Sequence, residues 1–466
     1  MNERSAGGMS AAVVRLGGCL AGWGDWPGGA VPMVERGGVD YLGYDFLSEL
    51  TMTILAKRRA RLGPHEGYVP DVARILAPVL PAAGEGRTRV VTNAGGMYPR
   101  GALRKVARAL VEAGFPDTPV AEVTGDDVLG RLDTFVAEGV ELTDHATGMH
   151  FREYADRAVF AHAYLGARPV QEALAAGAHV VTAGRVTDAA LFLGPILHET
   201  GWRDLDRLAT GLVVGHLLEC SGMVTGGSSN FWRDAVDPWN PGYPVAEVGR
   251  DGSVVITKTP GTGGLVSRGT VIEQLLYEIH DPAAIVSPDV VADITAAHVG
   301  QVGRDRVAVS GVRGTPAPDT LKLLIGYRDG WTGEGTIMFS WPEALDKARR
   351  AEQILRHRID AEALPVRELL FEYIGVNALH GPTAPIPPDP NEVMLRVCGR
   401  FDRAEPARAL FELILPLFSM APATPAGFAG RPAVRETVAL AVTALPAALV
   451  SPRVDCLPAR EAAEEE

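Results

Sequence analysis

The chain of 466 residues is 47% hydrophobic and 22% charged, a globular composition that is long enough for two domains. Its 44 Lys and Arg stand against 57 Asp and Glu, and the net charge of −13 excludes nucleic acid as an expected partner, because phosphate binding needs a basic surface. No apolar run reaches the roughly 18 residues of a membrane span, and the four cysteines are dispersed, so we expect a cytoplasmic protein with no membrane partner.

Short apolar runs alternate with helical patterns in the first half of the chain. The runs predict strands in five segments, residues 11–18, 39–45, 88–96, 119–127 and 178–188. Between them, Leu103, Val106 and Leu110 recur at helical spacing and the pattern ends at Gly114, which is typical of an amphipathic helix. This alternation predicts a mostly parallel sheet flanked by helices.

Each of the five expected strands is followed by a polar loop. Ligands of parallel α/β sheets bind outside the carboxyl ends of the strands, so these loops together predict a site along that edge. Any single loop can equally be polar because Asp and Thr cap the next helix. The candidate residues in these loops are Asp25, Asp45, Asn93, Gly95, Gly96, Arg185 and Asp188.

The segment 204–220, DLDRLATGLVVGHLLEC, has apolar residues at helical intervals and predicts a helix that ends before Gly226 and Gly227. His216 and Cys220 are then one turn apart on one face, and an imidazole can generate the nucleophilic thiolate. Two readings stay open, because a helix C-terminus disfavours a thiolate and cysteine is often buried without any function. Glu219 and His216 are alternative acid/base candidates.

Beyond residue 225 the predicted strands and helices follow a different order. Strands are expected at 253–258, 306–312, 320–340 and 391–401, with helices at 342–359 and 405–418. We therefore predict a parallel α/β domain over residues 11–225, a smaller α+β domain over residues 226–457, and a disordered acidic tail over residues 458–466.

The segment TKTPGTGGLVSRGTVIEQ, residues 257–274, combines a glycine-rich loop with the start of an expected helix. Thr270 and Glu273 have the spacing of a capping box, and free N–H groups at a helix start can bind a phosphate or carboxylate. The same pattern also describes a plain turn before a well-capped helix. The anion-binding candidates are Lys258, Gly261, Gly263, Gly264 and Arg268.

Nucleotide, nicotinamide and metal motifs are missing from the sequence. No Gly-Lys-Ser/Thr follows the glycines of the 257–274 segment, and GGCLAGWG does not match the GxGxxG pattern. The histidines show neither HxxxH nor HxH spacing. We therefore identify no cofactor and no metal site, although coenzyme A could enter as part of a substrate.

Several long blocks resemble, in the same order, the acyclic terpene utilisation (AtuA-like) family. They are VVTNAGGMYP, AHAYLGARPVQEALAAGAHVVTAGRVTDAALFLGP, GHLLECSGMVTGG, VITKTPGTGGLVSRGTVIEQLLYEIHDPAAIVSPDVVAD and VSGVRGTPAPDTLKL. The resemblance runs from about residue 12 to Val454. It implies a role in bacterial catabolism of citronellol- and geraniol-type terpenes through branched acyl-CoA thioesters, and it carries over no catalytic residue as such.

The chain departs from the family-like pattern at three places. His162 and His179 stand where Asn and an acidic residue are expected, and SSNFWRD follows Gly227 in place of a shorter aromatic run. The small C-terminal domain of longer family members is also missing. These departures imply that the substrate differs within the family and that the pathway could be biosynthetic.

We expect an enzyme, and a homo-oligomer, that acts on a small branched or hydroxylated acyl thioester by acid/base lyase or hydratase chemistry. In this hypothesis Glu219 or Asp188 is the base, His216 is the acid, and Asn93 with the Gly226 and Gly227 N–H groups binds the oxyanion. One alternative is acyl transfer or thioester hydrolysis with Cys220 as the nucleophile. Another is a non-catalytic subunit that binds acyl-CoA.

Overall fold

The computed structural model describes residues 13–423, 425–427 and 433–464, and contacts divide the chain into two compact units. Unit 1 comprises the chain up to Glu153, Phe160–Ile325 and the segment from Ala441 onward. Unit 2 comprises Tyr154–Val159 and Gly326–Leu440. The predicted division at residue 225 therefore falls inside unit 1.

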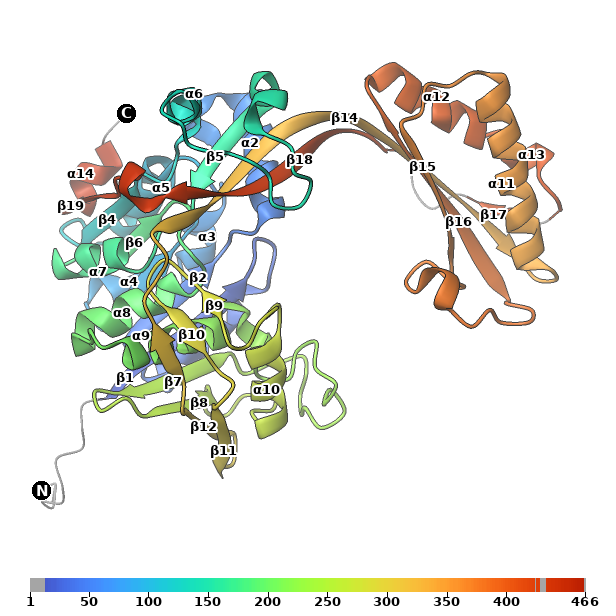
Figure 1. Ribbon diagram of the computed structural model, residues 1–466. Helices are drawn as coiled ribbons and strands as arrows, with labels where there is room; N and C mark the ends of the chain where they lie inside the picture. The colour runs from blue at the N-terminus through green and yellow to red at the C-terminus, as the bar shows by residue number, and fades with distance from the viewer. Residues whose placement is uncertain (1–12, 424, 428–432, 465–466) are drawn as a thin grey trace, which may run out of the picture. The chain divides into compact units, whose positions relative to one another are not determined.

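Unit 1 is built on a ten-stranded sheet with the order β11-β12-β8-β7-β1-β2-β3-β6-β4-β19 (Figure 1). Its strands are β1 (Val13–Ala21), β2 (Tyr41–Asp45), β3 (Arg89–Thr92), β4 (Pro119–Thr124), β6 (Val180–Ala183), β7 (Pro244–Gly249), β8 (Val254–Lys258), β11 (His298–Gly303), β12 (Arg306–Ser310) and β19 (Arg453–Pro458). β1, β2, β3, β6 and β4 coincide with the five strands expected in the first half of the chain, and their four neighbouring pairs are parallel.

The expectation of a mostly parallel sheet is wrong for the sheet as a whole, which is mixed. Five further pairs are antiparallel: β1 with β7, β7 with β8, β8 with β12, β12 with β11, and β4 with β19. The reason is that β7 and β8, and β11 and β12, are joined by short turns, and a short turn can connect only antiparallel neighbours. These hairpins extend the sheet with residues that we had assigned to the second domain.

Helices cover both faces of this sheet. Leu42 and Tyr44 of β2 share a core with α3 and α5, whereas an added Cβ at Gly43 would meet the ring of Phe192 in α8. Because successive strand residues point to opposite faces, α8 covers the face opposite to α5. The helices of unit 1 are α1 (Ala30–Pro32), α2 (Glu49–Leu62), α3 (Val72–Leu76), α4 (Leu80–Gly84), α5 (Pro99–Glu112), α6 (Leu132–Ala137), α7 (Arg168–Ala175), α8 (Ala190–Thr200), α9 (Leu205–Glu219), α10 (Arg268–Leu276) and α14 (Ala459–Glu464).

Helix α14 corrects the prediction of a disordered tail from residue 458. Ala459 and Ala462 are fully buried in the core that includes α5, and Arg108 of α5 donates a hydrogen bond to the carbonyl oxygen of Ala463. The apolar alanine face therefore stabilises a helix that the acidic residues alone did not suggest. Residues 465 and 466 of the predicted tail lie outside the described residues.

A small three-stranded sheet of unit 1 consists of β9 (Ile285–Val286), β10 (Val291–Asp293) and β13 (Arg313–Thr315). β10 and β13 pack against α9. The turn between β9 and β10 contains Ser287 and Pro288. This places the turn beside the helix that carries His216 and Glu219.

Unit 2 has a β-α-β-β-α-β order of elements and a sheet ordered β15-β16-β14-β17. Its apolar core lies between this sheet and the helices α11 and α12. The elements are β14 (Thr320–Ser340), α11 (Ala344–Ala361), β15 (Glu368–Ile374), β16 (Glu392–Phe401), α12 (Ala404–Ile414), α13 (Leu417–Met420), β17 (Pro425–Gly427) and β18 (Ala433–Pro446). β14 begins in unit 1, where β5 (Ala158–Ala163) pairs with it. Within the described part of the chain, no helix is long and apolar enough to cross a membrane.

Candidate functional site

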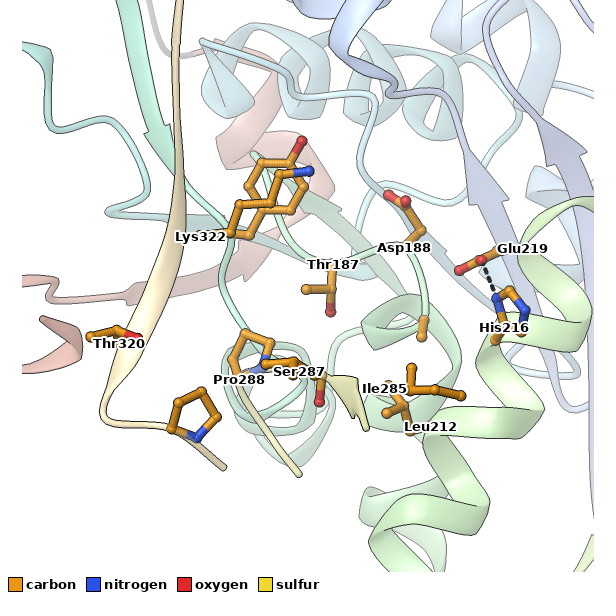
Figure 2. A pocket seen from close by; sticks show the side chains of 14 residues that line it. Thr187, Asp188, Leu212, His216, Glu219, Ile285, Ser287, Pro288, Thr320 and Lys322 are labelled. Carbon is orange, nitrogen blue, oxygen red and sulfur yellow. Dashed lines mark hydrogen bonds and ion pairs between the residues drawn. The ribbon is translucent and has the colours of Figure 1, made fainter. Parts of the chain in front are cut away.

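A cavity of about 250 Å³ in unit 1 brings together residues from the β6 loop, helix α9, the β9 turn and the start of β14. The charged side chains of Lys322, Asp188 and Glu219 lie along one side, and Leu212, Ile285 and Pro288 lie along the other (Figure 2). The lining residues are Tyr164, Thr187, Asp188, Ala189, Leu212, His216, Glu219, Ile285, Val286, Ser287, Pro288, Pro318, Thr320 and Lys322. Three of the five predicted catalytic residues, Asp188, His216 and Glu219, thus border one cavity.

Glu219 and His216 form a pair in the last turn of α9. His216 Nδ1 lies 2.8 Å from Glu219 Oε1, and the two side chains are 12% and 17% exposed. Burial raises the pKa of Glu219, and the charge of Asp188 acts in the same direction. Burial by itself would lower the pKa of His216, but the hydrogen bond and charge of Glu219 outweigh it and the pKa is raised. Both shifts favour a state in which the pair retains a proton.

His216 is therefore placed to orient Glu219. Its Nδ1 is engaged by Glu219, and its Nε2 is buried with no hydrogen-bond partner among the described residues. Neither ring nitrogen is therefore available to a ligand, because Nδ1 is bound to Glu219 and Nε2 is buried. Proton exchange with the cavity would pass through Glu219. Gln274 of α10 supports this turn by donating from Nε2 to the carbonyl oxygen of His216 over 3.1 Å.

Asp188 is held by a buried cation. Arg185 Nη1 donates to Asp188 Oδ1 over 2.8 Å, and the Arg185 residue is 1% exposed whereas the Asp188 side chain is 34% exposed. The neighbouring Asp188 and Tyr164 raise the pKa of Arg185 against the effect of its burial. Arg185 also donates to the Leu47 carbonyl oxygen, and its backbone N–H is bound by Asp126. The predicted Arg185 thus acts behind the cavity wall, while Asp188 faces the cavity.

Asp45 and Asn93 form a buried pair behind these residues. Asn93 Nδ2 donates to Asp45 Oδ1 over 2.7 Å, and Asn93 Oδ1 accepts the Phe46 N–H over 2.7 Å. Burial, with the negative charges of Asp188 and Glu219, raises the pKa of Asp45 well above its ordinary value. Asn93 is fully buried and does not line the cavity. Its amide instead links the β2 and β3 loops.

The two glycines expected to bind an oxyanion, Gly226 and Gly227, and the two glycine candidates of the β3 loop, Gly95 and Gly96, also use their N–H groups internally. Gly226 donates to Met223, and Gly227 to Gly222, within the turn that follows α9. Gly95 donates to Ala183 O, and Gly96 donates to Asn93 O. None of these four lines the cavity, so the structure does not bring them together with Asp188 and Glu219.

Asp25 lies in an exposed loop and accepts hydrogen bonds from the backbone N–H groups of Ala21 and Trp26. It does not line the cavity. This side chain closes its own turn, which is the alternative that the sequence left open for each polar loop.

Cys220 is the C-cap of α9 and does not line the cavity. Burial, followed by the charge of the neighbouring Glu219, raises the pKa of its thiol to about 12. The thiolate is the nucleophilic form of cysteine, so this environment disfavours covalent catalysis.

The predicted anion-binding loop is occupied by contacts within the chain. Gly263 and Gly264 donate to Asn240 O and Val236 O. Lys258 is bound by the Thr262 carbonyl oxygen at 2.8 Å and by Asp305 at 3.5 Å. This loop does not line the cavity, and the Gly263 and Gly264 N–H groups already have acceptors within the chain.

The start of α10 also differs from the prediction. Its N-cap is Ser267, which forms the capping box with Thr270. Glu273 instead accepts hydrogen bonds from Ser229 and Asn230 and so holds the segment after Gly227. Gly261 at φ +71° is in the left-handed turn before the helix, and Arg268 is exposed and donates to Val299 O.

The sequence analysis missed three residues: Lys322 and Tyr164, which line the cavity, and Glu49, which binds both of them. Lys322 Nζ donates to Glu49 Oε1 over 2.9 Å, and the Tyr164 hydroxyl donates to the same oxygen over 2.8 Å. Burial alone would raise the pKa of Glu49, but the hydrogen bond and charge of Lys322 lower it to about 2. The only sequence signal was the lysine between two leucines in LKL, which alternates as a half-buried strand does.

Among the described residues, no group of three or more His, Cys, Asp or Glu side chains is arranged to hold a metal ion. The two carboxylates that line the cavity, Asp188 and Glu219, are instead paired with Arg185 and His216, and Glu49, outside the lining, is paired with Lys322. The arrangement offers paired carboxyl groups and a cation around a partly apolar cavity, which suits proton transfer on a small organic molecule.

A family model described as "Acyclic terpene utilisation family protein AtuA" matches residues 14–456. This match covers nearly the whole chain and includes all lining residues of the cavity. No curated protein and no solved structure gives a match.

Proposed function

Because the chain belongs to the acyclic terpene utilisation family AtuA, we propose that it is an enzyme that transfers protons on a small branched or hydroxylated acyl thioester. The reaction class is lyase or hydratase chemistry, in which one carboxyl group acts as base and another as acid. The site is the cavity that Asp188 and Glu219 line.

The observation that carries this proposal is the contrast between the two carboxyl groups. Asp188 is ion-paired with Arg185, whereas Glu219 is buried beside His216 and its pKa is raised. Two carboxyls in such different environments can divide the roles of base and acid at neutral pH. We assign the base to Asp188 and the acid to Glu219, with His216 as the residue that positions Glu219.

The remaining wall supports a branched hydrocarbon substrate. Leu212, Ile285 and Pro288 present apolar surface opposite the charged side (Figure 2). The volume of about 250 Å³ is slightly below the roughly 300–1,000 Å³ of typical small-molecule sites. Such a space fits a short acyl group and not a whole coenzyme A, whose bulk would remain outside.

The proposed chemistry balances in either version. In hydration, Asp188 takes a proton from water, the water oxygen bonds to C3 of an enoyl thioester, and Glu219 delivers a proton to C2. In the lyase reaction, Asp188 takes the proton of a 3-hydroxyl group, the C2–C3 bond breaks to leave a carbonyl, and Glu219 protonates C2. Both versions exchange a proton at C2.

The alternatives receive less support. Acyl transfer through Cys220 needs a thiolate, and this thiol lies outside the cavity lining with its pKa raised to about 12. A non-catalytic subunit that only binds acyl-CoA would not need a carboxyl pair with opposed environments, and turnover of any thioester would refute it.

The test is deuterium incorporation at C2 of 3-methylcrotonyl-CoA and 3-hydroxy-3-methylbutanoyl-CoA in D2O, followed by mass spectrometry. We expect the wild-type protein to catalyse exchange, and Glu219→Gln and Asp188→Asn to lower its rate about 10²- to 10⁴-fold, the usual contribution of a general acid or base.

Glu278→Gln is the matched control. Glu278 is an exposed carboxylate that influences Glu219 electrostatically but does not line the cavity, so its variant should retain exchange. Equal rates in wild type, Glu219→Gln and Asp188→Asn would refute the proposal, as would wild-type protein that exchanges neither thioester.

A further inference from the structure

Lys322 supplies a cation to the same cavity. Among the described residues that line it, Lys322 is the one lysine or arginine. It projects from β14 on the side facing Asp188 and Glu219 (Figure 2). The family resemblance assigned no role to it, and neither did the spacing of any motif.

The ammonium group is held in place without being withdrawn from the cavity. Lys322 Nζ lies 2.9 Å from Glu49 Oε1 and 4.5 Å from the centre of the Tyr164 ring. The Lys322 side chain is still 43% exposed. An ammonium has three donors, so the hydrogen bond to Glu49 leaves capacity for a ligand oxygen.

The environment also keeps Lys322 charged. Burial would lower its pKa, but the neighbouring Tyr164 and Glu49 outweigh burial and raise it. Arg185 lies against the same Tyr164 ring, with its guanidinium carbon 4.1 Å from the ring centre. The ring is thus fixed between contacts with two cations, and this limits the movement of Lys322.

An oxygen-binding group is what the cavity otherwise lacks. The expected oxyanion donors, Asn93 and the Gly226 and Gly227 N–H groups, are all engaged within the chain and lie outside the lining. Charge that develops on an acyl oxygen during proton transfer at the adjacent carbon needs a donor or cation at that oxygen.

We propose that Lys322 binds the acyl oxygen of the substrate. It thereby selects substrates with an anionic or carbonyl oxygen next to the carbon at which Asp188 and Glu219 exchange a proton. This inference rests on the proposed function for the identity of that carbon. The binding role itself can be measured without turnover.

The experiment compares three probes with the same branched chain: 3-methylbutanoate, 3-methylbutanamide and the N-acetylcysteamine thioester of 3-methylbutanoic acid. Dissociation constants are measured by calorimetry for wild type, Lys322→Met, Lys322→Arg and Lys105→Met. Lys105 is exposed on α5 and outside the cavity, so it controls for removal of one positive charge.

We expect Lys322→Met to weaken binding of the acid about 10- to 100-fold, the effect of losing one hydrogen bond to a charged group, and to weaken binding of the amide less, because its carbonyl oxygen carries no full charge. Lys322→Arg should restore part of the preference for the acid, and Lys105→Met should match wild type. A parallel loss for the thioester identifies a thioester carbonyl as the bound oxygen, and a loss for the acid alone identifies a free carboxylate.

Equal weakening of acid and amide in Lys322→Met would overturn the inference, because it would mean that Lys322 only maintains the shape of the cavity. So would an unchanged affinity for all three probes. These outcomes differ from those expected if the proton-transfer proposal is wrong. In that case Glu219→Gln would not change deuterium exchange, and the wild-type protein would still bind the acid more tightly than the amide.

Discussion

Asp45→Asn should make the protein progressively more stable than wild type as the pH rises. Asp45 is 5% exposed, and burial beside Asp188 and Glu219 raises its pKa well above the ordinary value of about 3.9. The folded protein therefore keeps a proton that the unfolded chain releases. Asparagine has an oxygen in the same place to accept from Asn93 and Leu47, so the substitution preserves those hydrogen bonds.

The sign and size of the effect follow from proton linkage. Where the folded pKa is the higher one, the stabilisation is complete below the unfolded pKa and is lost as pH rises through the folded pKa. The loss is about 1.4 kcal/mol for each pH unit between the two pKa values. The asparagine of the Asp45→Asn variant has no proton to lose in this range, so the stability difference between variant and wild type should grow by that amount per unit from about pH 4 upward.

Urea unfolding at a series of pH values measures this difference. Tryptophan fluorescence reports mainly on unit 1, which contains five of the seven tryptophans, among them the buried Trp202. Asp133→Asn, in the exposed first turn of α6, removes a carboxyl group elsewhere and should show no such trend. If the difference between Asp45→Asn and wild type stays constant with pH, Asp45 is ionised in the folded protein and the reasoning about its burial is wrong.

Two further predictions concern the end of α9. Gly18→Ala would put a Cβ 2.3 Å from the Leu218 carbonyl oxygen, so we expect a loss of about 1–3 kcal/mol in unfolding free energy and weaker binding of 3-methylbutanoate. Gly17→Ala meets the side-chain ends of Met33 and Leu42 and no backbone atom, so it should bind normally, and equal binding by both variants would contradict this. Cys220→Ser should retain deuterium exchange, because a thiol with a pKa of about 12 is ionised to the order of 10⁻⁵ at pH 7, and an acyl adduct on Cys220 in intact-mass spectra would contradict that expectation.

The parallel part of the fold could be predicted from the sequence because its signals are local. Each of β1, β2, β3, β4 and β6 is a short apolar run bounded by turn residues, and α5 shows a clear apolar stripe. The mixed character of the sheet could not be predicted in the same way. It depends on which strands pair across long sequence distances, as β1 does with β7, and composition does not encode that choice.

Of the residues predicted from polar loops, only Asp188 lines the cavity. Asp25, Asn93, Gly95 and Gly226 satisfy backbone groups of their own or neighbouring loops and do not reach the cavity. A loop must satisfy its own buried polar groups before it can offer one to a ligand. For this reason the presence of a polar loop at a strand end is weak evidence for any particular side chain.

The separation of partners along the chain explains which contacts could be predicted from the sequence. Arg185 with Asp188 and His216 with Glu219 are both three residues apart, so their contacts are set by one loop or one helical turn. Asp45 with Asn93 is separated by 48 residues and Glu49 with Lys322 by 273, so those contacts exist only through the tertiary fold.

Local and long-range contacts of the site should differ in how easily they are disrupted. A local pair forms whenever its helix or loop forms, whereas the contact between Lys322 and Glu49 requires β14 to be docked in unit 1. The pairs that position the proposed base and acid are therefore formed by local structure, whereas the contact that positions the proposed oxygen-binding Lys322 is formed by long-range packing. Substitutions that loosen the start of β14 should consequently impair recognition of an acyl oxygen by Lys322 before they disturb the pairing of His216 with Glu219.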